Sequence, residues 1–579
     1  MTLQELFNRS CVQYADRLAI SFVNGTPMTY AEVKQEVEKI TVLLYRMGIN
    51  KGDRVMILSG NMPNWCIAYF AITTMGAIAV PVLPDFHTDE VQNIIEHSGS
   101  KAIFISQKLQ EKIVGLQSET LTHKIAIEDF SMISGKLSEA PVVTPEAPAD
   151  DDTAAILYTS GTSGRSKGVM LSHRNITFDA EQCLHIQDVN LNDVFLSILP
   201  LAHTYENTIS FILPFMQGAS IYYLEKPPTA SVLIPALGKV RPTTILSVPL
   251  VIEKIYRSQV QAKFTKSKPV KLMYEHVAPF RKFVHFLAGK KLYKTFGGRV
   301  RFFGIGGAKL DAVVERFLRE ARFPYAIGYG LTETAPMIAG SNPSQTFFQG
   351  IGKAMPEVQV KLDNPDLRTG VGEILVKGDN VMQGYYRDPE MTRSVFTDDG
   401  WFRTGDLGCL DKHQRLSHKG RLKNMILGAS GENIYPEDIE SVINNVRGVL
   451  ESLVLQQKGK LVAMVHLNME ELEKSYHQMR TNTLFTMEEL EKSYQQMRAN
   501  TIQYFTGKKE ELSKQKEECM EELSKQKDEL TKYVEQYIEE LKTYVNQRLN
   551  KFSQIHSVVV VSDPFEKTPT QKIKRYLYY

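Results

Sequence analysis

The chain has 579 residues, which is too long for a single hydrophobic core and so predicts two or more domains. Hydrophobic residues make up 43% of the chain and charged residues 23%, which is typical of a soluble globular protein. The formal net charge of +2 gives no support for nucleic-acid binding, so an anionic ligand must be met by local Lys, Arg or backbone N–H groups. The five cysteines are widely spaced and form no CxxC pair or Cys/His cluster, which predicts reduced cytosolic thiols and no zinc site.

Helical and strand patterns alternate from the start of the chain. Residues 1–20 carry several charges and lack the apolar region of a signal peptide. Amphipathic spacing predicts a helix over Tyr30–Met47, and short apolar runs predict strands at Arg54–Leu58 and Ala102–Ile105. The most apolar stretch, Cys66–Leu83, is interrupted by Thr, Gly and Pro, so we expect a buried helix that runs into a strand, not a membrane span. This alternation predicts α/β architecture with largely parallel sheets.

A loop rich in glycine and hydroxyl residues follows an apolar strand at Ala154–Tyr158. The segment reads Ile156-Leu-Tyr-Thr-Ser-Gly-Thr-Ser-Gly-Arg-Ser-Lys-Gly168. Glycines let backbone N–H groups approach phosphate oxygens, the hydroxyls add donors and Lys167 adds a positive charge. The spacing is not that of a Walker A loop, because Lys167 is followed by Gly168 and not by Ser or Thr. We interpret the loop as a phosphate site whose candidate residues are Thr159, Ser160, Gly161, Thr162, Ser163, Gly164 and Lys167.

The sequence changes character after about residue 350. Shorter β-like runs occur at Val358–Leu362 and Glu373–Val376, with Gly and Asp between them. We therefore predict a large N-terminal α/β core of several subdomains over residues 1–408 and a small, mobile α+β domain over residues 409–579.

The smaller domain contains a repetitive insertion at residues 468–531. MEELEKSYHQMRTNT begins at Met469, and the near-duplicate MEELEKSYQQMRANT begins at Met487. The motif EELSKQK begins at Glu510 and again at Glu521. Periods of about eighteen and eleven residues complete about five and three α-helical turns, so each repeat returns the same helix face.

The insertion is predicted to be mostly helical, from Asn468 to Asn550. Breaks are expected near Thr481–Thr486 and Thr506–Gly507, where the apolar stripe is interrupted. Its mixed Lys/Glu pattern lacks the polybasic clusters that bind anionic membranes. A charged helical hairpin without chemistry is the simplest interpretation, and an interaction module for a protein, a lipid surface or a second copy of the chain is the alternative.

The loop at residues 156–168 resembles the signature of the adenylate-forming superfamily, which includes acyl-CoA synthetases, luciferases and peptide-synthetase adenylation domains. The family usually has Thr at the position of Ser163 and often Pro at that of Ser166. A second segment, Gly328-Tyr-Gly-Leu-Thr-Glu-Thr-Ala-Pro336, resembles the family's other major motif. The resemblance implies that Tyr329 and Gly330 border the adenine, that Thr332 lies near the α-phosphate, and that Glu333 and Thr162 serve the Mg²⁺ ion of ATP.

Further segments resemble the family's motifs in the family's order. Phe303-Gly-Ile-Gly-Gly-Ala-Lys-Leu310 implies that Gly306, Gly307 and Ala308 wall the adenine. Trp401-Phe-Arg-Thr-Gly-Asp-Leu407 implies a ribose contact at Asp406, and Arg421 is implied as a second ribose or phosphate contact. The family usually has Asp three residues after this Arg, where the present chain has Asn424.

Three segments of the C-terminal part complete the resemblance. Asp411-Lys412 matches the hinge between the two domains, and residues 428–436 resemble the segment that lines the pantetheine tunnel. The C-terminal run from Phe565 to Arg575 resembles the segment that ends the family's chains, and it implies that Lys572 is the catalytic lysine.

Two segments narrow the resemblance to the long-chain fatty acyl-CoA synthetases. They are Leu199-Pro-Leu-Ala-His-Thr-Tyr-Glu206 and Val248-Pro-Leu-Val-Ile-Glu-Lys-Ile-Tyr256, and the first implies that His203 flanks the acyl site. The implied reaction uses a fatty acid, ATP, Mg²⁺ and coenzyme A. An acyl-AMP ligase that loads a carrier protein, with the insertion near its partner, is the alternative. A cytoplasmic protein is expected, and contact with the inner face of a membrane stays open.

Overall fold

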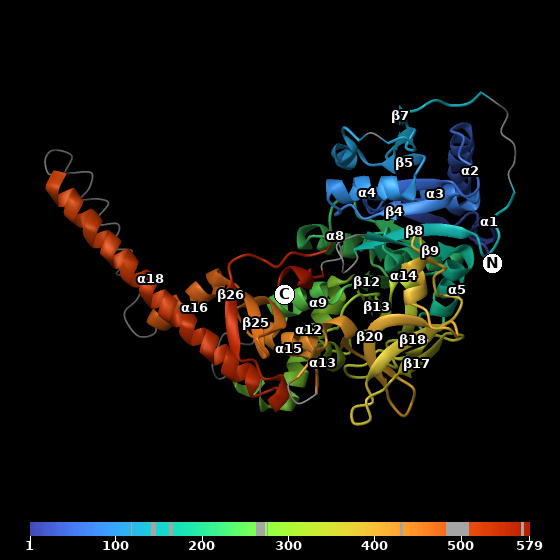
Figure 1. The fold of residues 1–579 in the computed structure, drawn as a ribbon. Coiled ribbons are helices and arrows are strands. Elements are labelled where there is room, and N and C mark those ends of the chain that lie inside the picture. The colour runs from blue at the N-terminus through green and yellow to red at the C-terminus, as the bar shows by residue number, and fades with distance from the viewer. Residues whose placement is uncertain are drawn as a thin grey trace. The chain divides into compact units, whose positions relative to one another are not determined.

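The computed structural model describes residues 1–116, 118–139, 146–160, 166–261, 272–274, 276–428, 432–481, 509–568 and 572–579. The chain divides into two units, Met1–Lys419 and Gly420–Tyr579 (Figure 1). The boundary predicted after residue 408 lies inside strand β20 (Phe402–Leu410), and the hinge at Asp411-Lys412 stays a prediction. Within the ranges just given, no helix is both long and apolar enough to cross a membrane.

One large sheet of the first unit carries the phosphate-loop candidates. Its central pairs β3·β4, β3·β5, β5·β6 and β4·β8 are parallel, and the pairs β8·β9, β9·β19 and β6·β7 are antiparallel. The strand order is β19 (Gly384–Tyr385), β9 (Ser166–Ser172), β8 (Thr153–Ser160), β4 (Ile78–Val82), β3 (Arg54–Leu58), β5 (Ala102–Ile105), β6 (His123–Ala126) and β7 (Met132–Ser134). The strands predicted at Arg54–Leu58 and Ala102–Ile105 are confirmed.

A second sheet carries the two predicted adenine segments. The pairs β1·β11, β10·β11, β10·β12, β12·β13 and β13·β14 are parallel. The pairs β1·β2, β14·β15 and β15·β16, at the two ends of the sheet, are antiparallel. The order is β16 (Lys353–Ala354), β15 (Met337–Gly340), β14 (Tyr325–Gly330), β13 (Phe302–Ile305), β12 (Thr244–Ser247), β10 (Val194–Ser197), β11 (Ser220–Tyr223), β1 (Leu18–Phe22) and β2 (Met28–Thr29). A smaller sheet contains β17 (Gln359–Asp363), β18 (Gly372–Lys377), β20 and β21 (Leu416–Arg421), and its pairs β17·β18 and β18·β20 are antiparallel.

Helices cover these sheets, and aromatic side chains fill the space between them. The largest core cluster takes buried residues from both large sheets and from the helices between them. Phe215 belongs to this cluster, and its ring centroid lies 4.7 Å from that of Phe70 and 4.6 Å from that of Tyr30. The helices are α1 (Leu3–Gln13), α2 (Tyr30–Arg46), α3 (Pro63–Thr74), α4 (Thr88–Ser98), α5 (His173–Cys183), α6 (Thr204–Glu206), α7 (Leu213–Met216), α8 (Ala230–Val240), α9 (Pro249–Tyr256), α12 (Ala278–Thr295), α13 (Ala312–Glu320) and α14 (Pro389–Ser394).

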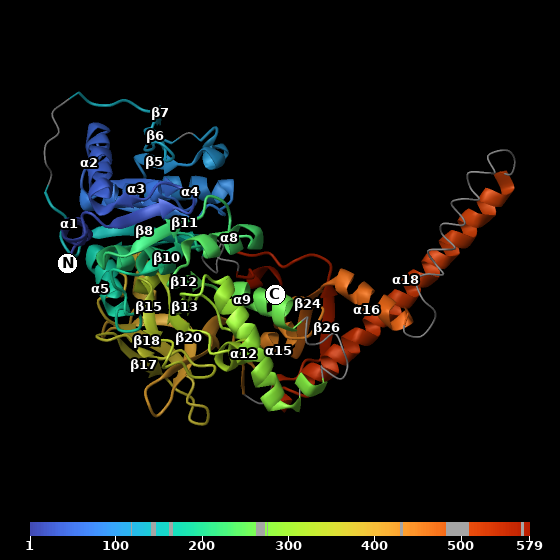
Figure 2. The ribbon, with the colours of Figure 1, turned by 180° about the vertical axis from the view of Figure 1, so that it is seen from behind.

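The predicted N-terminal helices follow from local sequence signals. A capping box of Thr29 and Glu32 starts α2, which ends one residue before the predicted bound at Met47. Helix α3 is buried on nearly every side and leads into β4, as expected for the apolar stretch Cys66–Leu83. Figure 2 shows α2, α3 and α4 beside the strands of the first sheet, with β17 and β18 at the other end of the unit.

The second unit is an α+β unit around a three-stranded sheet. Strands β24 (Val449–Gln457) and β25 (Lys460–Leu467) are antiparallel, and β26 (Ser557–Val561) joins β25 in parallel. The two-stranded sheet of β22 (Ile426–Leu427) and β23 (Asn433–Ile434) precedes α15 (Pro436–Asn444). The predicted fold class, an α/β core followed by a smaller α+β unit, is confirmed.

The described parts of the predicted insertion are helical. Helix α16 (Met469–Thr481) packs on α18 (Lys509–Asn546), a single helix of 38 residues (Figure 1). Leu541 and Val545 of α18 are buried in one cluster with Leu472 of α16. The second repeat at Met487 and the residues of both predicted breaks beyond Thr481 lie outside the described residues.

Candidate active site

The phosphate-loop candidates belong to the hairpin of β8 and β9. Thr159 of β8 is paired with Lys167 of β9, so the two candidates face each other across the hairpin. Gly161, Thr162, Ser163 and Gly164 lie outside the described residues, and so does the side chain of Ser160. The phosphate contacts of this loop, and the metal role of Thr162, therefore stay predictions.

Tyr385 joins Lys167 to Glu333. The Lys167 ammonium lies 5.0 Å from the centroid of the Tyr385 ring, within the range of a cation–π contact. The Tyr385 hydroxyl donates a 2.9 Å hydrogen bond to Oε1 of Glu333. Two candidates from separate motifs thus share one neighbour. The sequence did not predict Tyr385 as a site residue. Only the pairing of β19 with β9 brings it beside Lys167 and Glu333, and no local pattern signals that pairing.

The predicted adenine and ribose residues are also in direct contact. The Tyr329 hydroxyl donates a 2.9 Å hydrogen bond to Oδ2 of Asp406, and Asp406 is only 2% exposed. Nε2 of His418 lies 3.7 Å from Oδ1 of the same carboxylate, and the His418 and Tyr329 ring centroids are 5.7 Å apart. His418, on β21, was not predicted as a site residue. The contact fixes the orientation of the buried Asp406 carboxylate.

The turn after Tyr329 is held by backbone hydrogen bonds. Gly330 ends β14, and Thr332 and Glu333 lie in the short 3₁₀ helix η4 (Thr332–Thr334). The Leu331 N–H donates to the carbonyl of Pro336 at 3.0 Å, and the Met382 N–H donates to the carbonyl of Glu333 at 2.9 Å. A backbone bonded at both ends of the turn holds the Glu333 carboxylate on a rigid support.

The predicted adenine loop lies against the predicted acyl segment. Gly306, Gly307 and Ala308 follow β13, and the Gly306 N–H donates to the carbonyl of Ser247 at 3.2 Å. A Cβ atom at Gly306 would lie 3.0 Å from Cζ of Tyr205, so a larger residue would displace that ring. The Tyr205 N–H in turn donates to Nδ1 of His203 at 3.2 Å. Tyr205, which had no assigned role, therefore links His203 to the glycine loop.

Glu206 is an ionisable group buried beside this contact. The residue is 0% exposed. Burial raises the pKa of its carboxyl to about 8, although the Ser197 and Ser210 hydroxyls and backbone groups of the preceding loop favour the ionised form. Glu206 directly precedes the π-helical segment η2 (Asn207–Ile212), a type of local distortion that is frequent at functional sites.

Two candidates lie in the second unit. Arg421 ends β21, and Lys572 lies on the C-terminal segment. The backbone of Lys572 is fixed by Thr568, whose N–H donates to the Lys572 carbonyl at 2.8 Å and whose Oγ1 accepts from the Lys572 N–H at 3.2 Å. Their contacts with a nucleotide stay predictions.

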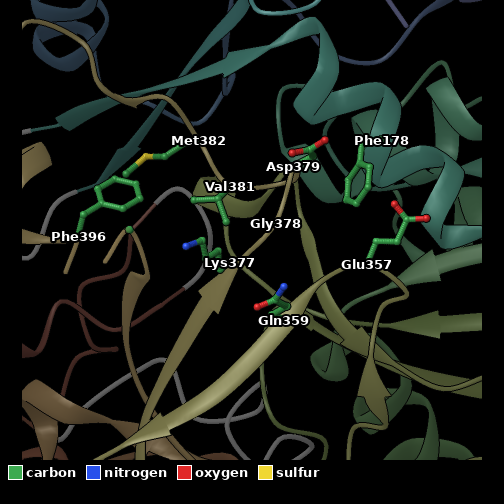
Figure 3. A pocket seen from close by; sticks show the side chains of 10 residues that line it. Phe178, Glu357, Gln359, Lys377, Gly378, Asp379, Val381, Met382 and Phe396 are labelled. Atoms are coloured by element: carbon green, nitrogen blue, oxygen red, sulfur yellow. The ribbon is translucent and has the colours of Figure 1, made fainter. Parts of the chain in front are cut away.

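A separate hollow opens beside β17 and β18 (Figure 3). In this view Met382 and Phe396 lie on one side of it, and Phe178 and Glu357 lie on the other. None of its lining residues is a predicted site residue. The full lining is Phe178, Glu357, Gln359, Lys377, Gly378, Asp379, Val381, Met382, Phe396 and Gly400.

Among the acidic candidates, Glu333 has the surroundings that a Mg²⁺ ion of ATP needs. In the part of the chain that the structure describes, no group of three or more His, Cys, Asp or Glu residues could hold a metal ion. Mg²⁺ is usually held by one or two carboxylates together with substrate phosphates and water. Glu333, bonded by Tyr385 through Oε1, fits such a site as the single protein carboxylate.

Residues 7–386 match the family model described as AMP-binding enzyme, and this match spans more than half of the chain. The protein therefore belongs to the family of AMP-binding enzymes. It is 30% identical over 490 residues to the peroxisomal long chain acyl-CoA synthetase 7 of Arabidopsis thaliana, covering 77% of this chain and 69% of that protein. It is 28% identical over 488 residues to the long-chain-fatty-acid–CoA ligase FadD15 of Mycobacterium tuberculosis, covering 77% of this chain and 78% of that protein.

Another relative is named for a different acceptor, and solved structures share the fold. The chloroplastic long-chain-fatty-acid–[acyl-carrier-protein] ligase AEE15 of Arabidopsis thaliana is 26% identical over 576 residues, covering 83% of this chain and 78% of that protein. ATP-bound MatB from Rhodopseudomonas palustris has a TM-score of 0.72 at 23% identity, covering 100% of this chain and 98% of that chain. The o-succinylbenzoate coenzyme A synthetase MenE of Bacillus subtilis, with ATP and a magnesium ion, has a TM-score of 0.70 at 21% identity, covering 99% and 98%.

Proposed function

We propose that the protein is a long-chain fatty acyl-CoA synthetase. It joins a fatty carboxylate oxygen to the α-phosphorus of ATP, which releases pyrophosphate, and then transfers the acyl group to the thiol of coenzyme A, which releases AMP. The observation that carries this proposal is the contact between Tyr329 and Asp406, since it unites two nucleotide motifs far apart in the sequence. The segments at residues 199–206 and 248–256, and the relatives named for long-chain acids, support the acyl class.

The nucleoside end of ATP is assigned to Asp406 and Tyr329. A carboxylate accepts hydrogen bonds from both hydroxyls of a ribose, and Asp406 has this chemistry. The Tyr329 hydroxyl orients the carboxylate, and its ring offers a face to the adenine. Gly306, Gly307 and Ala308 then form the opposite wall, with Tyr205 behind them.

The triphosphate end is assigned to Lys167 and Glu333. Lys167 and the backbone N–H groups of the loop at residues 159–164 would bind phosphate oxygens. Glu333 would hold the Mg²⁺ ion, which supplies charge neutralisation and Lewis-acid polarisation of the phosphates. Tyr385 orients both side chains, because its ring lies under the Lys167 ammonium and its hydroxyl bonds Glu333.

The chemistry needs positioning and charge neutralisation more than proton transfer. The fatty carboxylate is already ionised at neutral pH, so a general base is unnecessary and His203 acts only as a wall of the acyl site. Carboxylate and phosphate repel each other, and the Lys572 ammonium would bind both during the first half-reaction. Exclusion of water from the site would protect the acyl adenylate from hydrolysis.

A pyrophosphate-release screen over acids from acetate to stearate, with and without coenzyme A, tests the proposal. Each methylene buried in an apolar tunnel adds roughly 0.8 kcal/mol, about fourfold in kcat/KM, so activity should rise with chain length until the tunnel is full. Asp406→Asn is the control variant: its side chain has nearly the same shape but lacks the carboxylate, so it should release less pyrophosphate with every acid. A strong preference for acetate or an aromatic acid would contradict the assignment.

A carrier protein is the second candidate acceptor, and the likeness to the acyl-carrier-protein ligase AEE15 favours keeping it. Mass spectrometry of the product with coenzyme A and with a phosphopantetheinylated carrier protein separates the two candidates. The proposal expects acyl-CoA as the product. If the acylated carrier protein formed and acyl-CoA did not, the carrier protein would replace coenzyme A as the proposed acceptor.

A further inference from the structure

The first two turns of α15 present two carboxylates on one face. Helix α15 begins at Pro436, and Glu437 and Glu440 follow three residues apart, which places them on the same side of the helix. Neither residue has a role in the function proposed above. Both contact segments of the second unit that carry candidate active-site residues.

Glu440 holds the C-terminal segment through Arg575. The residue is 7% exposed, and its Oε2 forms an ion pair with the Arg575 guanidinium. Its Oε1 accepts a 2.7 Å hydrogen bond from the Val454 N–H, and Nη1 of Arg575 donates to the Val454 carbonyl at 3.4 Å. Burial raises the pKa of the Glu440 carboxyl to about 7, and the Arg575 charge opposes that rise. The pair therefore ties α15, β24 and the C-terminal segment together.

Arg575 lies three residues after Lys572 and begins the 3₁₀ helix η7 (Arg575–Leu577), directly after a short antiparallel pairing. In this pairing Lys567 lies opposite Ile573, and the Lys574 N–H donates to the Glu566 carbonyl at 2.8 Å. The other side of the pairing is anchored separately, because the Lys567 ammonium lies 2.6 Å from Oε2 of Glu451. A fixed Arg575 therefore limits how far the backbone of Lys572 can shift.

Glu437 reaches from the same guanidinium to the segment that bears Arg421. Its Oε1 accepts a 2.7 Å hydrogen bond from Nδ2 of Asn424 and lies 3.9 Å from Nη2 of Arg575. Gly420, with φ of +142°, packs so closely that a Cβ there would lie 2.8 Å from Oε2 of Glu437. This geometry gives the departure at Asn424 a physical reason, since an Asp there would set two carboxylates against each other, whereas the amide donates.

We propose that Glu437, Glu440 and Arg575 form a positioning node that holds the Arg421 and Lys572 segments in fixed relation to each other. The inference rests on the proposed function, which gives Lys572 its part in adenylate formation. These three are positioning residues, acting through Arg421 and Lys572. The first half-reaction needs both segments placed, so loss of the node should slow adenylation more than thioester formation.

The test measures the two half-reactions separately in Arg575→Ala and Arg575→Lys. In Arg575→Ala, fatty-acid-dependent pyrophosphate release should fall tenfold or more, while acyl-CoA formation from supplied acyl-AMP stays within threefold. Arg575→Lys should recover part of the loss, because it keeps the charge. The matched control is Arg447→Ala, which removes an exposed Arg–Glu pair of the same unit and should change neither rate. Equal losses in both half-reactions, or no loss, would overturn the node.

A charge-swap pair tests the Glu437 branch. Asn424→Asp should raise the KM for ATP about tenfold, and adding Glu437→Gln should restore it by reversing donor and acceptor. Failure of the double variant to recover, in a protein with an unchanged Tm, counts against the branch.

Hydrogen exchange keeps the node separable from the proposed function. In Arg575→Ala, the amides of Thr568 and Lys574 should exchange at least tenfold faster, while those of β25 stay protected. If the unaltered chain released no pyrophosphate with any acid, the proposed function would fail. Unchanged hydrogen exchange at these two amides in Arg575→Ala would, independently of that result, overturn the node.

Discussion

Different kinds of contact hold two regions of the molecule. One region is the set of nucleotide-binding candidates in the first unit, and the other is the helical arm of the second unit, which consists of α16 and α18. In the first unit single polar atoms meet, as Tyr329 meets Asp406 and Tyr385 meets Glu333. In the arm an apolar stripe that includes Leu541 and Val545 packs into a shared core. Directional contacts fail when one atom is removed, whereas a stripe tolerates substitutions that conserve volume. The difference predicts which changes alter chemistry and which alter only stability.

The largest effect is expected for Lys572→Ala. It should lower acyl-adenylate formation by about 10²–10³-fold, the range seen when one preorganised donor to a developing charge is removed. Thioester formation from supplied acyl-AMP should be nearly unchanged. Lys574→Ala, two residues further on, is the control, and the two half-reactions are followed by pyrophosphate release and by acyl-CoA. Parallel loss of both would mean that Lys572 serves no specific step.

Asp406→Ala should weaken ATP binding. It removes the acceptor of the Tyr329 hydroxyl and two hydrogen bonds to the ribose, each about 1.5–3 kcal/mol before compensation, so the KM for ATP should rise tenfold or more. Asp399→Ala, on the exposed loop before β20, serves as the control. An unchanged KM would remove Asp406 from the ribose site.

Tyr385→Phe probes the contact that sequence reasoning missed. The variant keeps the ring beneath Lys167 but loses the hydrogen bond to Glu333, about 1.5–3 kcal/mol for a charged acceptor. We expect kcat/KM to fall about tenfold, with a higher Mg²⁺ concentration needed for half-maximal rate. Tyr385→Leu should lose more, because the cation–π contact goes too. A Mg²⁺ dependence identical to that of the unaltered chain would separate Tyr385 from the metal-bearing carboxylate.

Glu206→Gln should make stability less sensitive to pH. The folded Glu206 carboxyl keeps its proton up to a pKa of about 8, whereas the unfolded carboxyl loses it near 4.5. The folded state therefore binds more protons between these values, and stability falls as the pH rises through that window. Gln cannot ionise, so the variant should match the unaltered chain near pH 4 and exceed it by on the order of 4 kcal/mol at pH 8. Urea titrations at both pH values measure this, and a constant difference would exclude the titration.

Replacement of residues 469–531 by a short Gly/Ser linker should have the smallest effect on chemistry. Acyl-CoA synthesis should stay within about tenfold, or about 1.4 kcal/mol of barrier. The Tm should drop, because Leu472, only 3% exposed, leaves the core it shares with Leu541. Gel filtration reports any change in oligomeric state. Loss of adenylation in a folded replacement variant would erase the contrast between site and arm.

Sequence patterns gave the elements and the candidate residues, and they did not give the contacts between them. Helix α2 and strands β3 and β5 follow from local periodicity and capping, so they were predictable. Tyr385 was not, since it reaches Glu333 only through the pairing of β19 with the distant strand β9. His418 was not either, since its contacts combine Asp406 on the neighbouring strand β20 with Tyr329 from a distant segment. The Asn424–Glu437 bond was equally hidden, because it joins a turn to a helix thirteen residues later.

The stiffness of α18 has a mechanical consequence. A continuous helix of 38 residues is about 57 Å long, and its C-terminal half is fixed in the core of the second unit by Leu541 and Val545. The helix would therefore act as a lever arm, and a rotation of the unit by about 10° would move the N-terminal end of α18 through about 10 Å. A small rotation that moves Lys572 would thus become a displacement large enough to follow by distance measurements between spectroscopic probes, one of them near Lys509.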